Sequence, residues 1–364
     1  MKAAVMNRVN EPLAIEQLEL RDPRHGEVLV RTVASGVCHS DLHFMEGLWP
    51  AQVPIVLGHE ASGIVEGVGE GVSYVKKGDP VILSFAPFCG VCRDCTEGRP
   101  QLCTSPAGRL PAGPDSAARI FRDGVPVNQF ANLGSFAEYM LVPENGLVKS
   151  PEGMPLDKAA LVGCSVMTGI GAVLNTAKVE PGSTVAAIGT GGVGLNVIQG
   201  AVLANASRII AIDVLDNKLE YAKTVGATDV INAANDDPVQ AVQGLVRGGV
   251  DYAFEAIGNT KAGAQAFDMV RRGGTAVIVG MMPFGSKMEI NAASFLGEKC
   301  LKGSYYGSTR FRVDMPRLCD FYLRGKIKLD ELVSRHYPLE EINEAYDAMK
   351  KGEVARSVLD IGAA

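Results

Sequence analysis

The chain has 364 residues, of which 47% are hydrophobic and 21% charged, and its formal net charge is −6. This length suits two domains that each bury a core, and the composition is that of a globular protein rather than a disordered one. A net negative chain with a single Trp and no basic run lacks the electrostatic footprint of a nucleic-acid-binding surface, so no nucleic-acid partner is expected.

No export signal or membrane segment is expected. The first twenty residues carry Asn, Arg, Glu and Pro where a secretory signal needs an unbroken apolar stretch. The most apolar window, 159–174, is interrupted by Gly, Ser and Thr and is shorter than the roughly 20 residues of a membrane span, so it is predicted to be a buried segment. Eight cysteines in such a chain favour thiolate chemistry or metal binding over disulfides, and a cytoplasmic location is expected.

Residues 1–165 are predicted to form a β-rich, barrel-like domain. Short runs containing Val and Ile are separated by Gly-Glu, Gly-Asp and Pro, and the expected strands include 28–33, 62–68 and 79–84. Residues 104–127, rich in Gly, Pro and Ala, are interpreted as a long irregular excursion. Loops of that length tend to be functional or to build interfaces.

Residues 166–305 change in texture from about Pro181 onwards. Strand, helix and strand within about 30 residues make a βαβ unit, which implies a parallel sheet covered on both faces. The expected alternation runs through 184–188, 193–206, 208–212, 218–225, 251–255 and 275–280.

Residues 306–364 are predicted to contain two helices, at 315–324 and 339–351, and a final strand at 357–361. We expect this segment to return and complete the first domain. The fold class predicted from the pattern is therefore α/β, a doubly wound parallel sheet plus a β-rich domain.

A glycine motif follows the strand at 184–188. The run Gly189-Thr190-Gly191-Gly192-Val193-Gly194 contains G-x-G-x-x-G, opens a helix, and is followed roughly 20 residues later by Asp213 at the end of the next strand. Glycines let the backbone approach a pyrophosphate, and the helix N-terminus offers free N–H groups. Asp213 would accept hydrogen bonds from ribose hydroxyls and repel a 2′-phosphate, which favours NAD over NADP. The alternative is a Gly-rich turn with an acidic residue at the sheet edge.

Four cysteines lie within one short segment, spaced C-x2-C-x2-C-x7-C: Cys89, Cys92, Cys95 and Cys103. A loop with this spacing can wrap one Zn²⁺ tetrahedrally, and four thiolates leave no open position, so such a site is structural. The alternative is a set of free or redox-active thiols, which would be prone to oxidation.

Further soft or borderline metal ligands lie beside carboxylates in Gly-bearing turns at 36–43 and 58–60, and Cys164 stands at the domain junction. Taken singly, a buried Cys is usually a small hydrophobe and a lone His a hydrogen-bonded polar residue. The spacing alone leaves a second metal site undecided.

The order of these motifs resembles the zinc-containing medium-chain alcohol dehydrogenases. GVCHSDLH, GHEASGIVEGVGEGV, the four-cysteine loop, GCSVMTGIGAV and GTGGVG occur in succession, and the likeness runs over nearly the whole chain. The resemblance implies a GroES-like catalytic domain at 1–165, completed by 306–364, and a Rossmann NAD-binding domain at 166–305. It also implies two Zn²⁺ per subunit, NAD(H), and an alcohol, aldehyde or ketone as partner.

The resemblance also assigns a catalytic zinc. It implies that Cys38, His59 and Cys164 are the three protein ligands, with a fourth position open to water or alcohol. Glu60 is then the acid that can approach the metal transiently, and Asp41 the carboxylate that holds His59 in its metal-binding tautomer.

Proton release and cofactor contacts follow from the same resemblance. The alcohol proton is expected to leave through Ser40, the nicotinamide ribose and His43. Besides Gly189, Gly191, Gly192 and Gly194, the implied cofactor contacts are Val193 and Thr168 behind the nicotinamide, Asp213 and Lys218 at the adenosine ribose, and Arg356 at the pyrophosphate. His39 stands where many members carry an Arg that binds the pyrophosphate, so weaker NAD(H) binding is predicted than in a His39→Arg variant.

The expected substrate pocket favours aromatic or extended apolar alcohols, with Ser40 at its base leaving slightly more room than the Thr common in the family. Ordinary core packing is the alternative for each lining residue. The candidate lining residues are Trp49, Phe85, Phe130, Met281 and Tyr305.

Three other functions compete with this interpretation. A glutathione-dependent formaldehyde dehydrogenase is similar in length and in the segment 326–331, but it needs an acid where Trp49 stands, although Arg109 could supply part of a glutathione site. A zinc-free quinone or enoyl reductase would lack the four-cysteine loop and the three zinc ligands. A non-catalytic NAD-binding protein would keep the fold without the reaction.

A homodimer is expected, because the excursion at 104–127 resembles the longer loop of dimeric members. Such dimers pair edge strands of their cofactor domains, and 282–290 is a candidate for that contact. The natural alcohol, the physiological direction and the stereochemical preference stay open. Cys300 and Cys319 have no assigned role and are expected to be structural.

Overall fold

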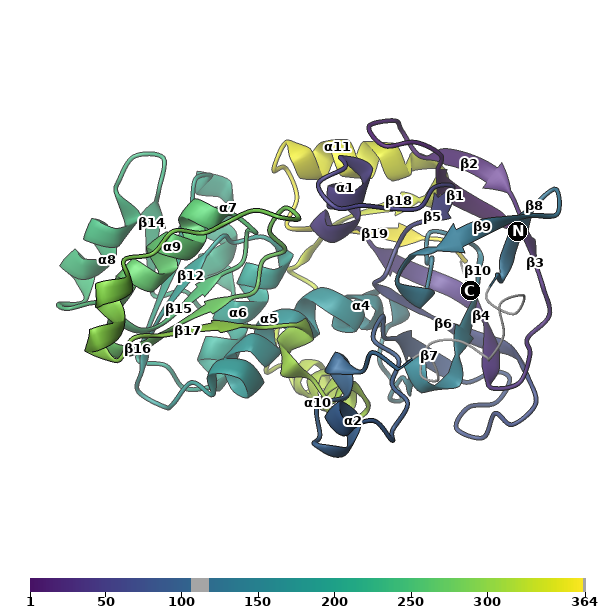
Figure 1. Ribbon diagram of the computed structural model, residues 1–364, viewed down its shortest axis with the longest axis horizontal. Coiled ribbons are helices and arrows are strands. Elements are labelled where there is room, and N and C mark those ends of the chain that lie inside the picture. The colour runs from purple at the N-terminus through teal and green to yellow at the C-terminus, as the bar shows by residue number, and fades with distance from the viewer. Residues whose placement is uncertain (106–117, 363–364) are drawn as a thin grey trace. The chain divides into compact units, whose positions relative to one another are not determined.

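The computed structural model describes residues 1–105 and 118–362 (Figure 1). The chain divides into two compact units. Unit 1 comprises Met1–Cys164, Arg310–Arg324 and Val333–Ala364, and unit 2 comprises Ser165–Thr309 and Gly325–Leu332. The segment 306–364, expected to return to the first domain, is thus divided between the units, since 306–309 and Gly325–Leu332 belong to unit 2.

Unit 2 is built on a six-stranded sheet in the order β14-β13-β12-β15-β16-β17, and all neighbouring strands are parallel. Numbered within the unit, this is the order 3-2-1-4-5-6 of the Rossmann fold. The strands are β12 (Thr184–Ile188), β13 (Arg208–Asp213), β14 (Asp229–Asn232), β15 (Val250–Glu255), β16 (Val270–Ile278) and β17 (Cys300–Gly303).

Helices alternate with these strands and pack on the sheet as two pairs, α6 with α7 and α8 with α9. The helices of unit 2 are α5 (Met167–Gly171), the π-helical η6 (Ala172–Ala177), α6 (Gly192–Leu203), α7 (Asp216–Thr224), α8 (Pro238–Leu245) and α9 (Thr260–Met269), with short 3₁₀ turns η7 (Ala292–Gly297) and η8 (Tyr306–Ser308). Because both faces of the sheet are covered, the central strands β12 and β13 are almost continuously buried. The predicted strand at 184–188 coincides with β12.

Unit 1 contains two sheets. One has the order β2-β1-β5-β9-β8-β3, and the other the order β11-β7-β6-β4-β19-β18, with β10 also paired to β4. The strands are β1 (Lys2–Met6), β2 (Ala14–Gln17), β3 (Glu19–Leu20), β4 (Glu27–Gly36), β5 (Ile55–Val56), β6 (Ala61–Val68), β7 (Pro80–Leu83), β8 (Ile120–Arg122), β9 (Val125–Gln129), β10 (Tyr139–Pro143), β11 (Leu147–Lys149), β18 (Val333–Pro338) and β19 (Arg356–Asp360). The C-terminal strand β19 therefore lies between β18 and β4, and β4 is far from both of the other strands in the sequence.

The helices of unit 1 are short except near the C-terminus. They are α1 (His39–Met45), α2 (Arg93–Thr96), η1 (Pro100–Leu102), η3 (Phe130–Asn132), η4 (Glu144–Gly146), α4 (Leu156–Leu161), α10 (Phe311–Leu323), η9 (Leu339–Glu341) and α11 (Ile342–Lys350), and the π-helical η5 (Val162–Val166) continues from α4. The excursion expected to be irregular over 104–127 is corrected at its end, where β8 and β9 pair as an antiparallel hairpin. Its residues 106–117, including Arg109, lie outside the described part of the chain.

Among the residues that the structure describes, one apolar helical stretch, Leu156–Ala177, is long and apolar enough to cross a membrane by length and composition. Of its apolar window, 83% is buried inside the protein, which is typical of a core helix. This confirms the buried segment predicted at 159–174.

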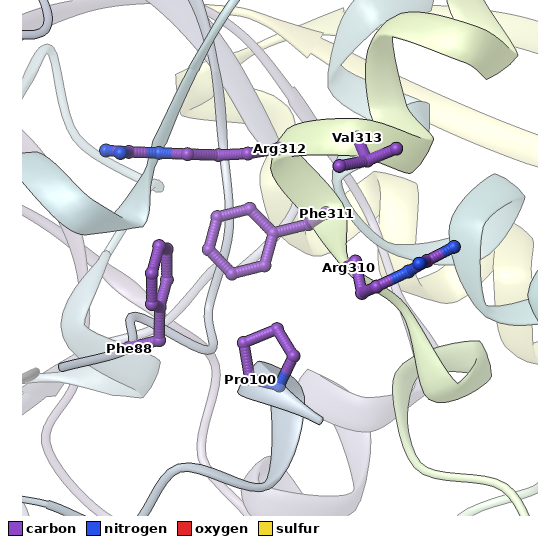
Figure 2. A pocket seen from close by; sticks show the side chains of 6 residues that line it. All are labelled: Phe88, Pro100, Arg310, Phe311, Arg312 and Val313. Carbon is purple, nitrogen blue, oxygen red and sulfur yellow. The ribbon is translucent and has the colours of Figure 1, made fainter. Parts of the chain in front are cut away.

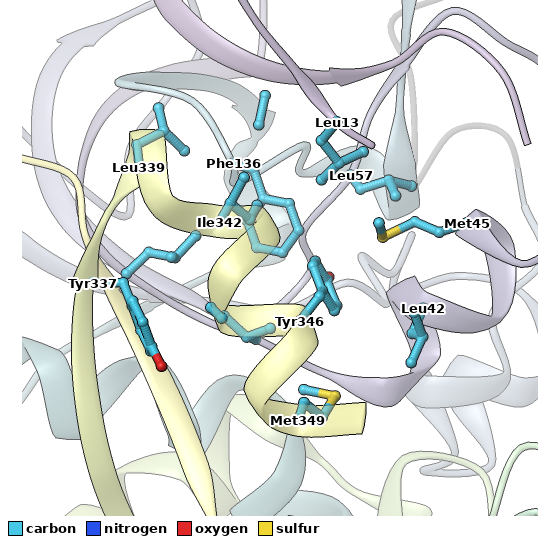
Figure 3. Close-up of a cluster of buried hydrophobic side chains, with 14 of the residues drawn as sticks. Leu13, Leu42, Met45, Leu57, Phe136, Tyr337, Leu339, Ile342, Tyr346 and Met349 are labelled. Atoms are coloured by element: carbon cyan, nitrogen blue, oxygen red, sulfur yellow. The ribbon is translucent and has the colours of Figure 1, made fainter. Parts of the chain in front are cut away.

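One hydrophobic core cluster of unit 1 joins α1 to α11. Leu42 and Met45 of α1 pack with Leu57, Phe136 and Tyr346, as Figure 3 shows. Their spacing places both α1 side chains on one face of that helix. Burying this face fixes the orientation of α1, which carries several candidate site residues.

Candidate metal centres and dinucleotide site

The first candidate centre is built around the start of α1. Cys38 precedes the helix in an extended conformation (φ −124°, ψ 145°), and Asp41 lies in the first turn, where a negative charge is favoured by the helix dipole. The Cys38 and Asp41 side chains are both buried. The Cys38 thiol, just before α1, and the Asp41 carboxylate, in its first turn, therefore both lie in the interior of unit 1.

Asp41 holds the segment that carries His59. Its Oδ1 accepts the Gly58 N–H at 3.0 Å, and His59 Nδ1 lies 3.1 Å from Oδ1 and 3.0 Å from Oδ2. Gly58 has φ +92°, and a Cβ there would lie 2.4 Å from Oγ of Ser135, so only glycine fits. With Nδ1 engaged by the carboxylate, Nε2 is the nitrogen left to act as a ligand.

Cys38, His59 and Cys164 converge on one point. Their candidate ligand atoms all lie within 4.8 Å of one another, and His59 Nε2 is 3.3 Å from Sγ of Cys164. Donor atoms around a tetrahedral zinc with bonds of about 2.1–2.3 Å are separated by about 3.5–3.8 Å. The two thiols and the imidazole fit a zinc ion that keeps a fourth position open.

The ionisation of the cluster agrees with a cation-binding site. The hydrogen bond from Cys164 and the charge of His59 lower the pKa of Cys38 well below its usual value, although burial opposes this. Burial also opposes the charged form of His59, but the Asp41 carboxylate and the Cys38 thiolate raise the pKa of His59 well above its usual value. The hydrogen bond to Cys38 and burial raise the pKa of Cys164. The Cys38 thiolate is buried beside a Cys164 thiol that does not neutralise its charge, and such a thiolate is a suitable ligand for a divalent metal.

A buried ion pair lies beside this cluster. Arg356, the first residue of β19, donates to Oε2 of Glu60, and the two side chains are 5% and 0% exposed. Burial works against the charge on Arg356, yet Glu60 and both cluster thiols raise the pKa of its guanidinium. Sequence reasoning assigned Arg356 to a pyrophosphate and Glu60 to the metal, and it missed this pair because nothing local links residues so distant in the chain.

The second candidate centre is the four-cysteine loop. Sγ of Cys92 lies 3.5 Å from Sγ of Cys95 and 3.8 Å from Sγ of Cys103, and the sulfurs of Cys89 and Cys95 are 3.9 Å apart. These separations match the edges of a tetrahedron around zinc. All four donors come from the loop itself, so the centre fits a closed, structural site.

The thiols of this loop cannot all ionise without a cation. Backbone N–H groups of Val91 and Cys92 lower the pKa of Cys89 to about 6. Burial and the neighbouring sulfurs raise the pKa of Cys95 to about 12. A divalent ion bound among the four sulfurs would favour the thiolate form of each cysteine and so allow all four to ionise.

The glycine motif forms the expected turn between β12 and α6. Gly189 has φ +89°, and α6 begins at Gly192 after Gly191 in extended conformation. A Cβ on Gly194 would lie 1.7 Å from the carbonyl oxygen of Gly189, so the first turn of the helix tolerates no side chain there. The backbone N–H groups of this helix start are thereby presented at the carboxyl edge of the sheet, where ligands of such sheets bind.

Asp213, the last residue of β13, is tied to the glycine turn. The N–H and hydroxyl of Thr190 donate to its Oδ2 at 2.8 and 2.9 Å. Its Oδ1 accepts the N–H groups of Val214 and Leu215 at 2.8 and 3.2 Å. The carboxylate is thus held rigidly, and Thr190 is a contributing residue that the motif did not single out.

The remaining predicted residues lie in both units. In unit 1, the His59 ring lies edge-on to the rings of Phe85 and Phe130 at 5.5 and 5.7 Å, and Phe44 links Phe130 to Trp49. His39 is exposed, whereas Ser40 and His43 are half-buried on α1. In unit 2, Thr168 is buried, Val193, Lys218 and Met281 are half-buried, and Tyr305 is 51% exposed.

A separate pocket of about 180 Å³ lies in unit 1 (Figure 2). Its lining residues are Phe88, Pro100, Arg310, Phe311, Arg312 and Val313. Arg312 is held by the Leu147 and Glu144 carbonyls and stacks on the ring of Tyr74 at 4.0 Å. None of the residues predicted to line the substrate pocket borders it.

One buried acid in unit 2 was not predicted. Oε1 of Glu255, at the end of β15, accepts the N–H groups of Ile257, Gly258 and Asn259 at 2.8, 2.6 and 3.2 Å. Burial raises the pKa of Glu255 although these hydrogen bonds oppose the shift. The carboxyl shapes the loop after β15 at the carboxyl edge, and an acid at the end of an apolar strand is the sequence signal for it.

Comparison with known proteins identifies the family of a chain with these two units and two candidate metal centres. Residues 24–152 match the family described as "Alcohol dehydrogenase GroES-like domain", and residues 192–324 match that described as "Zinc-binding dehydrogenase". The chain is 40% identical over 372 residues to the alcohol dehydrogenase class-3 of Dictyostelium discoideum, covering 99% of this chain and 97% of that protein.

Solved structures of dehydrogenases are also similar to this chain over nearly its full length. Benzyl alcohol dehydrogenase from Acinetobacter calcoaceticus has a TM-score of 0.93 and 35% identity, with 99% of each chain covered. A dehydrogenase from Sinorhizobium meliloti bound to NADP has a TM-score of 0.80 and 29% identity, with 99% and 98% covered. The chain belongs to the zinc-containing medium-chain alcohol dehydrogenase family. It is a zinc-dependent, nicotinamide-linked oxidoreductase with a GroES-like and a Rossmann domain, as predicted.

Proposed function

We propose that this enzyme transfers hydride reversibly between a bulky apolar or aromatic alcohol and NAD. The observation that carries the proposal is the convergence of Cys38, His59 and Cys164, a donor set that suits a zinc ion with one open position. The four-cysteine loop would hold a second, structural zinc, which gives two zinc ions per chain.

When bound, the zinc at the three-residue centre supplies Lewis-acid activation of an alcohol oxygen. Asp41 fixes the imidazole of His59 in the tautomer that presents Nε2, and Glu60, paired with Arg356, keeps a second carboxylate close by. Ser40 and His43 would carry the proton away. Burial lowers the pKa of His43, so its imidazole is neutral near pH 7 and able to accept that proton.

The substrate class is inferred from the candidate lining. The aromatic rings of Trp49, Phe85 and Phe130, together with Met281 and Tyr305, would favour aromatic or extended apolar alcohols, and Ser40 leaves space at the base. The similarity to benzyl alcohol dehydrogenase, at 35% identity over nearly the full length, supports the same class.

The cofactor is inferred to be NAD. Val193 and Thr168 would lie behind the nicotinamide, and Lys218 and Asp213 would bind the adenosine ribose. Because Asp213 is held as a charged acceptor, a 2′-phosphate beside it would be repelled. His39 and Arg356 would face the pyrophosphate. To bind it, Arg356 would either break its ion pair with Glu60 or contact both groups at once.

A glutathione-dependent formaldehyde dehydrogenase is the second candidate. It is favoured by the segment 326–331, which lies entirely within the stretch Gly325–Leu332 of unit 2. Trp49 in place of an acid argues against it. Activity on formaldehyde only in the presence of glutathione would establish it.

We also propose a cytoplasmic homodimer. One edge strand of the parallel sheet is β17, whereas 282–290, the expected contact, contains no strand. Exposed apolar side chains in the segment that connects β16 to β17, Phe284 at 68% and Leu296 at 86%, support an interface between two copies there. A monomer in light scattering would contradict the dimer.

A substrate screen tests the proposed function. NAD reduction is measured with primary, secondary, benzylic and terpenoid alcohols, beside zinc quantitation per chain. We expect the highest kcat/KM with benzylic or terpenoid alcohols and two zinc ions per chain. A preference for ethanol, or full activity without zinc, would contradict the proposal.

A further inference from the structure

The turn that follows β17 has an unusual backbone. Three successive residues adopt left-handed φ angles: Tyr306 at 55°, Gly307 at 64° and Ser308 at 49°. Two of the three carry a Cβ, which this region of φ disfavours. Contacts from elsewhere in unit 2 must therefore hold the turn in place.

A single hydroxyl group joins the two ends of this turn. Oγ1 of Thr176, in η6, lies 2.8 Å from Oγ of Ser304 and 2.8 Å from Oγ of Ser308. A hydroxyl can donate once and accept twice, so one side chain satisfies both contacts. Nδ2 of the neighbouring Asn175 donates to the Gly307 carbonyl at 3.2 Å. The helix thus binds the ends and the middle of the strained turn.

The turn is also pressed against helix α5. A Cβ on Gly307 would lie 2.4 Å from the Met167 carbonyl oxygen and 3.0 Å from that of Thr168, and a Cβ on Gly171 would lie 2.5 Å from the Gly307 carbonyl oxygen. Backbone meets backbone at this crossing without intervening side chains. The position of the turn relative to Thr168 is therefore set by direct contact.

Helix α5 makes the same kind of contact with the start of α6. A Cβ on Gly169 would lie 2.5 Å from the carbonyl oxygen of Val193. The turn at 304–308, which contains Tyr305, therefore contacts the backbone of α5 at Thr168. The backbone of α5 in turn contacts Val193 at the start of α6, so the three segments are packed together in unit 2. Tyr305, Thr168 and Val193 are three of the residues that the proposed function places at the nicotinamide and the alcohol.

The turn leaves the sheet at its carboxyl edge. The Ser304 N–H donates to the Ile278 carbonyl at 2.8 Å, and the glycine turn after β12 leaves from the same edge. Tyr305 is 51% exposed there. In parallel sheets of this kind this edge is where ligands bind.

We propose that Thr176 is a positioning residue for alcohol selection. Its hydroxyl fixes the strained turn, and with it the separation of Tyr305 from Thr168, so that the site discriminates between large and small alcohols. The proposal rests on the proposed function, in which Tyr305 lines the alcohol pocket. Thr176 acts through that turn and is not among the residues proposed to contact the alcohol or NAD.

The test compares Thr176→Val, which removes the hydroxyl, with Thr176→Ser, which keeps it. Steady-state kinetics are measured with benzyl alcohol and ethanol at saturating NAD. We expect Thr176→Val to lower the ratio of kcat/KM for benzyl alcohol over ethanol by about five- to tenfold, mainly through KM, because one or two hydrogen bonds are lost. Thr176→Ser should recover most of the ratio.

A second pair of variants separates positioning from simple stability. In a Tyr305→Ala background, Thr176→Val should leave the ratio unchanged, because the effect passes through Tyr305. An unchanged ratio in Thr176→Val alone, even with a lower Tm, overturns the proposal, and so does an equal loss in both backgrounds. Failure of the unmodified enzyme to reduce NAD with any alcohol would instead overturn the proposed function, and this proposal with it.

Discussion

Asp41 shows how much one buried carboxylate can organise. It accepts the Gly58 N–H, faces Nδ1 of His59 and lies in the first turn of α1, where its charge is favoured. Burial raises its pKa although the charge of His59 opposes the shift. The carboxylate and the imidazole therefore depend on each other, and we expect a change in either to affect the candidate metal centre.

An Asp41→Asn variant tests this dependence. The amide keeps the size of the side chain but loses the negative charge, so we expect zinc affinity at the three-residue centre or activity to fall about 10- to 100-fold. Zinc per chain is measured after dialysis against increasing chelator. Asp320→Asn, at a half-exposed position on α10, is the control. Equal zinc loss in both variants would show that Asp41 is dispensable.

Asp213 is the residue that we propose to determine the choice between NAD and NADP. Asp213→Asn keeps an oxygen for the Thr190 N–H but removes the charge that repels a 2′-phosphate. We expect the ratio of kcat/KM for NAD over NADP to fall by about tenfold, since a hydrogen bond to a charged group is worth about 1.5–3 kcal/mol. The same ratio in Asp216→Asn, changed at the start of α7, serves as reference. A constant preference in Asp213→Asn would contradict the assignment.

At the scale of elements, α1 depends on its neighbours. It has only seven residues, too few for stability by itself, and its buried face packs with α11 through Leu42 and Met45. Cys38, the candidate metal ligand at its start, owes its position to this packing.

Leu42→Ala should therefore weaken both the core and the metal centre. Truncating a buried Leu costs about 2–5 kcal/mol in the free energy of unfolding. Chemical denaturation and zinc retention are measured together. Leu48→Ala changes a side chain that is 38% exposed and should alter neither. Normal zinc retention in a destabilised Leu42→Ala protein would separate the two effects.

The ion-pair cluster at the start of β4 gives a pH dependence. Hydrogen bonds from Arg21, Arg24 and Arg119 lower the pKa of Glu27, although burial opposes the shift. A lowered pKa in the folded state contributes stability that is present above the unfolded value near 4.5 and is lost as pH falls through the folded value.

Glu27→Gln is expected to remove this contribution. At pH 7 the variant should lose about 3–5 kcal/mol, because Arg119 stays buried without its carboxylate. The difference from the unmodified enzyme should shrink as pH falls below 4.5. Urea unfolding at pH 7 and at about pH 3.5 measures both. A difference that stays constant with pH would contradict the role of Glu27 ionisation.

At the scale of the whole molecule, the sequence predicted the Rossmann domain best. Its central strands β12 and β13 are almost continuously buried, and such strands leave an unbroken apolar run in the sequence. Helices α8 and α9 were not predicted, although Asp237 and Asn259 are recognisable N-caps. Hydrophobic periodicity alone did not reveal them.

The metal centres differ in how far the sequence could go. The four-cysteine loop is local, and its spacing alone predicts a zinc site. Cys38, His59 and Cys164 are distant in sequence, and only the family resemblance joined them before the structure did. The pairing of Glu60 with Arg356 and the Thr176 bridge depend on tertiary contacts that leave no local pattern.

Because the chain divides into two compact units, we expect their stabilities to be separable. The single Trp, Trp49, belongs to unit 1, and the parallel sheet of unit 2 has its own core. Deleting 356–364 removes β19 from between β4 and β18. We expect Trp49 emission to shift to longer wavelength and zinc to be lost, because β4 loses a neighbour.

Limited proteolysis with mass spectrometry checks the other unit. A fragment close to Ser165–Thr309 should survive in the truncated protein after unit 1 is degraded. Removing only residues 363 and 364 leaves β19 whole and should change nothing. Degradation of both units at one rate would contradict their independence.

The place of β19 beside β4 also constrains biosynthesis. Roughly 300 residues separate the two strands, and at about 5–20 residues per second a ribosome needs some 15–60 seconds to deliver the second after the first. During that interval the nascent chain already displays Cys38 and His59, while the sheet that will enclose them is incomplete. We therefore expect the Cys38 thiol to stay accessible to oxidants until translation ends, so that the redox state during synthesis affects the yield of folded protein.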